Sequence, residues 1–105
     1  MECFLCRPKI KKITTAELRN VYLKDKKDRF FLDVRTPSEF KTQSIPGFIN
    51  ISLQLLHGKL DRIPRDKEIV VICQSGMRSS AACRMLKKAG FEQVTNVRGG
   101  MNRWS

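Results

Sequence analysis

The segment 68–73 constrains the fold more than any other part of this chain. It reads Glu-Ile-Val-Val-Ile-Cys, an uninterrupted apolar run in which most residues are β-branched. Branched side chains favour strands, and a continuous apolar run is typical of a strand covered on both faces, as in the middle of a parallel sheet. We therefore expect residues 68–73 to form the central strand.

Strand and helix signals alternate along the rest of the chain. Thr14 and Glu17 form a capping box that predicts a helix over 15–24, and Thr36 before Pro37 predicts the start of a short helix. Further strands are expected at 30–34, 48–51 and 94–97, and further helices after Ser52 and over 79–89. This alternation predicts an α/β fold with a central parallel sheet flanked by helices on both faces.

The length of the chain predicts one domain. Its 105 residues, 41% of them hydrophobic, suffice to bury a single core. Residues 1–13, which include Pro8 and a basic stretch, precede the first capping signal and are expected to be an N-terminal lead-in. The domain is then expected to span residues 14–105.

The charge of the chain is strongly positive. Twenty-one Lys and Arg against ten Asp and Glu give a formal net charge of +11, which attracts anions such as sulfur oxyanions, phosphates, acidic proteins or nucleic acid. The basic residues are spread along the chain with few aromatic residues among them, which favours a solvated surface over a nucleic-acid patch. No apolar run approaches the roughly 20 residues that span a bilayer, so we expect no membrane partner and a cytoplasmic location.

A reactive thiol is expected where the central strand ends. Cys73 is followed by Gln74, Ser75, Gly76 and Met77, and then by the start of the predicted helix with Arg78 and Ser79. Backbone N–H groups in such a turn can surround an anion, and the helix dipole adds positive potential at the same point. Both effects favour the thiolate form of the cysteine, which is the nucleophile. The sequence therefore predicts an anion-binding loop with nucleophilic Cys73 at its base, and Arg78 and the hydroxyl groups are expected to bind an oxyanion there.

The chain resembles the single-domain form of the rhodanese (thiosulfate sulfurtransferase) family from about Ile13 to Trp104. The resemblance rests on residues 31–40, 45–51, 73–79 and 99–104. It implies a rhodanese-like fold and a sulfurtransferase that needs no cofactor and binds no metal. In that reaction Cys73 takes a sulfane sulfur from thiosulfate or a persulfide donor, and a thiophilic acceptor removes it. The resemblance assigns pocket-forming roles to the loop residues Gln74 to Ser79 and supporting roles to Asp33 and Arg35.

The resemblance leaves partners and rival functions open. The expected partners are a small anionic sulfur donor such as thiosulfate and a thiol or sulfur-carrier protein, with RNA a weaker alternative. Phosphatases with a similar fold place five residues between Cys and Arg, whereas here four intervene, and this shorter loop favours sulfur over a phosphoryl group. Phosphatase or arsenate reductase activity and a non-catalytic anion- or partner-binding module remain alternatives.

Two positions depart from the family pattern. Ser44 stands where a His is common before the Ile-Pro-Gly turn, and Phe48 stands where a small residue is usual. Both substitutions are expected to affect packing more than chemistry.

The remaining cysteines and the single histidine are expected to lie outside the chemistry. Cys3 and Cys6 have the spacing of half a zinc site or a redox pair, but mobile terminal thiols are favoured because no second pair accompanies them. Cys83 is read as a small apolar helix residue rather than a thiol that resolves oxidised Cys73. No motif pairs His57 with Cys73.

Overall fold

The apolar run predicted as the central strand is β4 (Glu68–Ile72). In the computed structural model, which describes residues 9–104, β4 is the middle strand of a five-stranded sheet in the order β1-β5-β4-β2-β3. The other strands are β1 (Lys11–Ile13), β2 (Arg29–Asp33), β3 (Ile49–Asn50) and β5 (Val94–Val97). Every pairing in the sheet is parallel, which confirms the predicted α/β class.

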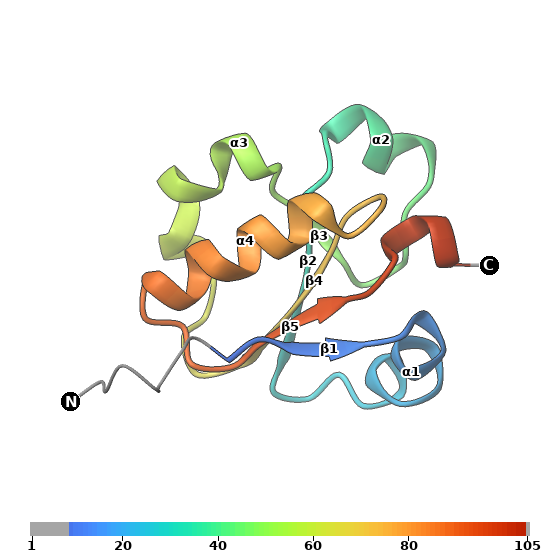
Figure 1. The fold of residues 1–105 in the computed structure, drawn as a ribbon, viewed down its shortest axis with the longest axis horizontal. Helices are drawn as coiled ribbons and strands as arrows, with labels where there is room; N and C mark the ends of the chain where they lie inside the picture. The colour runs from blue at the N-terminus through green and yellow to red at the C-terminus, as the bar shows by residue number, and fades with distance from the viewer. Residues whose placement is uncertain (1–8, 105) are drawn as a thin grey trace.

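The alternating side chains of β4 divide the core into two layers. Ile69 and Val71 pack with Leu86 of α4 (Met77–Lys88), whereas Val70 and Ile72 pack with Leu18 of α1 (Thr15–Asn20). A strand points successive side chains to opposite faces, so a continuous apolar run requires cover on both sides. Figure 1 shows this cover, with α4 and α3 on one side of the sheet and α1 on the other.

The helix starts follow the capping signals. Thr14 and Glu17 form the predicted capping box of α1, and Thr36 and Glu39 form a second box at the start of α2 (Pro37–Thr42). The remaining helical elements are α3 (Leu53–Leu56) and the 3-10 turns η1 (Tyr22–Lys24), η2 (His57–Arg62) and η3 (Gly100–Arg103). The predicted helix over 15–24 is thus split into α1 and η1.

One strand was not predicted, and helix α4 begins earlier than expected. Residues 11–13, expected in the lead-in, form edge strand β1, which pairs with β5. This strand is short, and both its lysines are exposed, so it lacks the apolar pattern by which strands are recognised. Helix α4 begins at Met77 rather than at 79, because Gly76 adopts a φ of 108° and serves as its N-cap.

The fold brings the carboxyl ends of the strands to one edge of the sheet. Asp33, the last residue of β2, pairs in register with Ile72, the last residue of β4. Ligands of parallel α/β sheets bind at this edge. Among the helices in the described part of the chain, none has the length and apolar character needed to cross a membrane.

Candidate active site

Cys73 lies immediately after β4 and is completely buried. Its Sγ accepts a hydrogen bond from the backbone N–H of Gly76 at 3.0 Å. The Ser79 Oγ lies 3.3 Å from the same sulfur and 3.1 Å from the Gly76 carbonyl oxygen. The sulfur is therefore contacted by a backbone N–H of the loop and by a side-chain hydroxyl from the first turn of α4.

The Ser79 hydroxyl suits either charge state of the sulfur. A hydroxyl has one proton and two acceptor lone pairs. While Cys73 is a thiol, its S–H can donate to Ser79 Oγ and the hydroxyl can donate to the Gly76 carbonyl. Once the sulfur is negative, the hydroxyl proton can turn toward it, so Ser79 adds a second donor to the Gly76 N–H.

The start of α4 supplies positive potential at the sulfur. The first N–H groups of a helix have no carbonyl partner within it, and the helix dipole is positive at this end. Helix α4 is 12 residues long and has no acidic residue in its first turn to offset that potential. The helix start therefore adds its positive potential to the hydrogen bond that the Gly76 N–H donates to the Cys73 sulfur.

The turn η3 holds the loop from its other side. Met101 N–H donates to the Cys73 carbonyl at 2.8 Å, and Asn102 N–H donates to the Gln74 carbonyl at 2.9 Å. Gly100 permits this approach, because a Cβ at that position would lie 2.2 Å from the Cys73 carbonyl oxygen. With these two carbonyls bound to η3, the peptide units of the loop are held in one orientation.

Asp33 and Arg35 form a buried ion pair beside the loop. Arg35 donates to the Asp33 carboxylate through Nη2 at 2.8 Å and through its backbone N–H at 2.9 Å, and both side chains are almost fully buried. Arg35 also donates to the carbonyls of Gln43 and Glu39. The pair thus joins β2 to α2 and to its C-cap residue Gln43, and it supplies the partner that a buried Asp33 requires.

The Gln74 side chain bridges Arg35, which follows β2, and Asn102 of η3. Its Oε1 accepts from Arg35 Nη1 at 3.3 Å, and its Nε2 donates to Asn102 Oδ1 at 2.7 Å. Both ends of the amide are therefore engaged, and Gln74 connects the Arg35 network to η3. Ser75 and Met77 are exposed at the rim of the loop, Met77 to 79%.

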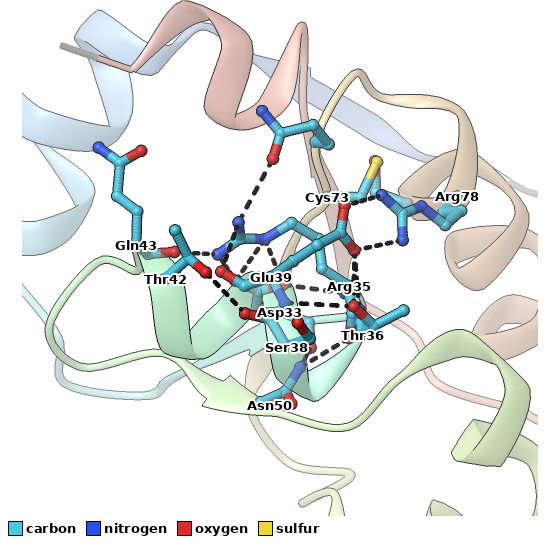
Figure 2. A network of polar contacts seen from close by, with 12 residues as sticks. Asp33, Arg35, Thr36, Ser38, Glu39, Thr42, Gln43, Asn50, Cys73 and Arg78 are labelled. Carbon is cyan, nitrogen blue, oxygen red and sulfur yellow. Dashed lines mark hydrogen bonds and ion pairs between the residues drawn. The ribbon is translucent and has the colours of Figure 1, made fainter.

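Arg78 is paired with Glu39. Its Nη1 lies 2.7 Å from Glu39 Oε1 and its Nη2 lies 3.0 Å from Oε2, a two-pronged ion pair that Figure 2 shows beside the Cys73 sulfur. The hydrogen bond from Arg78, and then the one from the Thr36 backbone, lower the pKa of Glu39 from 4.5 to about 2. The guanidinium that was expected to bind an oxyanion thus already has a carboxylate partner.

Glu39 and η3 are the parts of the site that the sequence analysis did not assign. Glu39 was included only in the segment 31–40 that carries the family resemblance, and the hydrogen bonds from Met101 and Asn102 to the loop carbonyls were not predicted. The signal for Glu39 is its position: α2 follows β2 directly, and β2 is the neighbour of β4. The first turn of α2 must therefore lie close to the loop that follows β4.

The other candidate residues lie apart from this chemistry or outside the described residues. Burial, followed by the charge of Cys73, raises the pKa of Cys83 to about 12, so Cys83 is a neutral thiol packed in the core. His57 lines a groove between η2 and α4 with Leu60 and Met85. Cys3 and Cys6 lie outside the described residues. Within 9–104, no group of three or more His, Cys, Asp or Glu side chains is arranged to hold a metal ion.

The fold and the loop together define a class: a small parallel α/β domain with a buried cysteine held between a central strand and a helix start. Residues 14–105 match the family of rhodanese-like domains. The chain is 36% identical over 83 residues to a sulfurtransferase of Allochromatium vinosum, covering 79% of this chain and 78% of that protein. It is 39% identical over 95 residues to the putative sulfurtransferase YtwF of Bacillus subtilis, covering 90% of each.

Solved structures agree with this assignment. A rhodanese-like domain protein from Staphylococcus aureus superposes with a TM-score of 0.84 at 31% identity, covering 91% of this chain and 92% of that one. A NAD-dependent persulfide reductase from A. fulgidus gives a TM-score of 0.72 at 42% identity, covering 91% of this chain but 16% of that one. The chain belongs to the rhodanese-like family, and its sulfurtransferase relatives support a role in sulfur transfer.

Proposed function

We propose that this protein moves sulfane sulfur from a donor to a thiophilic acceptor through a persulfide on Cys73. The observation that carries the proposal is the hydrogen bond from Gly76 N–H to Cys73 Sγ at 3.0 Å, made at the start of α4. A donor group aimed at this sulfur, together with the helix dipole, stabilises the thiolate and then the terminal sulfur of a persulfide. The nearby Ser79 hydroxyl adds to the same stabilisation.

The reaction consists of two displacements at sulfur. With thiosulfate, the Cys73 thiolate attacks the outer sulfur, the S–S bond of thiosulfate breaks, and its electron pair leaves with sulfite. The enzyme keeps the negative charge as Cys73–S–S⁻. An acceptor such as cyanide then attacks the terminal sulfur and leaves as thiocyanate, which regenerates the thiolate. No redox cofactor is needed, because each bond that breaks is replaced by one that forms.

The donor classes in this proposal are thiosulfate and persulfides, and the acceptors are thiols or a sulfur-carrier protein. The persulfide reductase among the structural relatives supports a persulfide as donor. The complete burial of Cys73 suits a slender terminal sulfur better than a tetrahedral phosphoryl group, and this argues against phosphatase or arsenate reductase chemistry. Nucleic acid as a partner, the cytoplasm as location and the domain bounds at 14–105 stay predictions from the sequence.

The test is persulfide formation on the intact protein. Wild type and Cys73→Ser are incubated with thiosulfate or with glutathione persulfide, and mass spectrometry locates any added sulfur atom. We expect one sulfur on Cys73 in wild type, release of thiocyanate on addition of cyanide, and neither in Cys73→Ser. Cys83→Ser is the matched control and should still take up the sulfur, since Cys83 is a neutral core thiol.

Equal thiocyanate formation by wild type and Cys73→Ser would refute the assignment of Cys73. Absence of a persulfide with every donor, together with ligand binding that survives Cys73→Ser, would instead identify an anion- or partner-binding module.

A further inference from the structure

The ion pair between Glu39 and Arg78 places a carboxylate at the site where an anionic donor has to bind. Arg78 contributes a positive charge beside Cys73. Its hydrogen bond to Glu39 is the main cause that raises the pKa of this guanidinium, and the charge of Cys73 adds to the effect. Glu39 accepts two hydrogen bonds from the guanidinium, at 2.7 Å from Nη1 to Oε1 and at 3.0 Å from Nη2 to Oε2. The two charges offset each other, and two of the donor groups of Arg78 are occupied.

The carboxylate is held in place by its own helix. Glu39 Oε1 accepts from the Thr36 backbone N–H at 2.9 Å and from the Thr36 hydroxyl at 3.1 Å, while the Glu39 N–H donates to Thr36 Oγ1 at 3.2 Å. This capping box fixes the same oxygen that meets Arg78. Because moving Glu39 away from Arg78 would also disrupt the cap of α2, an incoming anion does not displace it freely.

Charge on the leaving group therefore distinguishes one sulfur donor from another at this site. Thiosulfate carries two negative charges and leaves as doubly charged sulfite. A donor with the same sulfane sulfur on a less charged group meets less repulsion from Glu39 and has less need of the occupied guanidinium. The remaining attraction comes from the loop N–H groups and the start of α4, which act on the sulfur atom that is transferred.

We propose that Glu39 is a specificity-determining residue that selects donors with leaving groups of low charge, such as a neutral or singly charged persulfide, over thiosulfate. The inference rests on the proposed sulfur-transfer function and narrows its donor class. In each case the Cys73 thiolate attacks the sulfane sulfur, and the donor's bond to that sulfur breaks with its electron pair on the leaving group. Only the charge of that leaving group differs.

Thiosulfate and methanethiosulfonate are a suitable pair of probes. In methanethiosulfonate a methyl group replaces one oxygen of thiosulfate, so the donor has one negative charge and leaves as methanesulfinate. The measurement is kcat/KM for each donor with cyanide as acceptor. Each value is divided by the rate constant for the reaction of the same donor with a free thiol in solution, which corrects for the difference in intrinsic reactivity between the two donors. We expect wild type to favour methanethiosulfonate after this correction.

The decisive variant is Glu39→Gln. Glutamine retains the capping-box geometry but removes the charge, and it should raise kcat/KM for thiosulfate on the order of tenfold more than for methanethiosulfonate. Glu17→Gln is the matched control, because Glu17 has the same capping-box role in α1. It should leave the ratio of the two donors unchanged. Thermal unfolding of both variants checks that they fold.

The outcomes separate this inference from the proposed function. Persulfide formation with both donors but the same donor ratio in wild type and Glu39→Gln would overturn the role of Glu39 and leave sulfur transfer intact. No persulfide with either donor would remove the proposed function itself. If Glu39→Gln does not fold, the corrected donor ratio of wild type still decides, and a preference for thiosulfate would overturn the inference.

Discussion

At the scale of single residues, the buried pair of Asp33 and Arg35 has the largest structural role beside the site. Among residues 9–104, Arg35 is the largest of the fully buried side chains. Its guanidinium donates hydrogen bonds to β2, to α2 and its C-cap residue, and to Gln74 of the loop. A buried charge with a good partner is tolerated, but removal of the partner leaves the other charge without compensation. The pair therefore holds the carboxyl end of β2 in a fixed position relative to α2 and the active loop.

Asp33→Asn should destabilise the protein by about 3–5 kcal/mol, because Arg35 would remain buried without its carboxylate. Urea unfolding measures the loss. Asp61→Asn, at an exposed position, is the control and should change the free energy of unfolding by less than about 0.5 kcal/mol. A loss at Asp33 no larger than that of the control would show that the ion pair does not stabilise the fold.

At the scale of elements, the active loop depends on the turn η3 as much as on the helix it leads into. The carbonyls of Cys73 and Gln74 are bound by η3, and Gly100 allows the close approach with a φ of 56°. The two peptide units that follow Cys73 are thus oriented from a segment about thirty residues away in the chain.

Gly100→Ala should separate η3 from the loop. The new Cβ would lie 2.2 Å from the Cys73 carbonyl oxygen and 2.8 Å from that of Gln74, so backbone has to move, at a cost of about 2–4 kcal/mol. Persulfide formation should also slow, because the loop N–H groups lose their orientation. Gly58→Ala is the control: no atom lies within 4 Å of its Cβ position, and we expect a change below about 1 kcal/mol. Equal behaviour of the two variants would contradict the role of η3.

At the scale of the whole molecule, the net charge of +11 means that carboxylates paired with basic residues reduce the repulsion among those residues. As the pH falls, the carboxylates become protonated and the repulsion among the basic residues grows. Glu39 retains its charge to a lower pH in the folded state than an ordinary glutamate does, because its pKa is about 2 against an ordinary value of 4.5. A carboxyl with a lowered pKa stabilises the fold above pH 4.5, and this stabilisation is lost as the pH falls toward 2. The effect is modest, since the side chains of Glu39 and Arg78 are about one-third exposed.

The stability difference between wild type and Glu39→Gln should therefore depend on pH. It should be constant from neutral pH down to about 4.5, and should then shrink as the pH falls toward 2. Urea unfolding across this range measures it, with Glu17→Gln again as the control. A difference that stays constant down to pH 2 would show that the charge of Glu39 does not contribute.

Much of this organisation could be predicted from local sequence. The apolar run of β4 predicts its central place, and the order Cys73, Gly76, Arg78 predicts a loop at a helix start. The capping box of Thr14 predicts the start of α1, and Thr36 before Pro37 predicts the start of α2. These features depend on neighbouring residues, whose spacing is visible in the chain. Edge strand β1 escaped prediction because two exposed lysines in three residues carry no periodic signal.

The sequence by itself determined the class of fold, the central strand and the position of the thiol, because apolar patterning and capping act over a few residues. Only the tertiary structure decided which side chains meet at that thiol. The pairing of β2 with β4 brings Glu39 to Arg78, and the return of the chain after β5 brings η3 under the loop. Contacts between segments so far apart depend on strand order and on the burial of both sheet faces, and no local pattern specifies them.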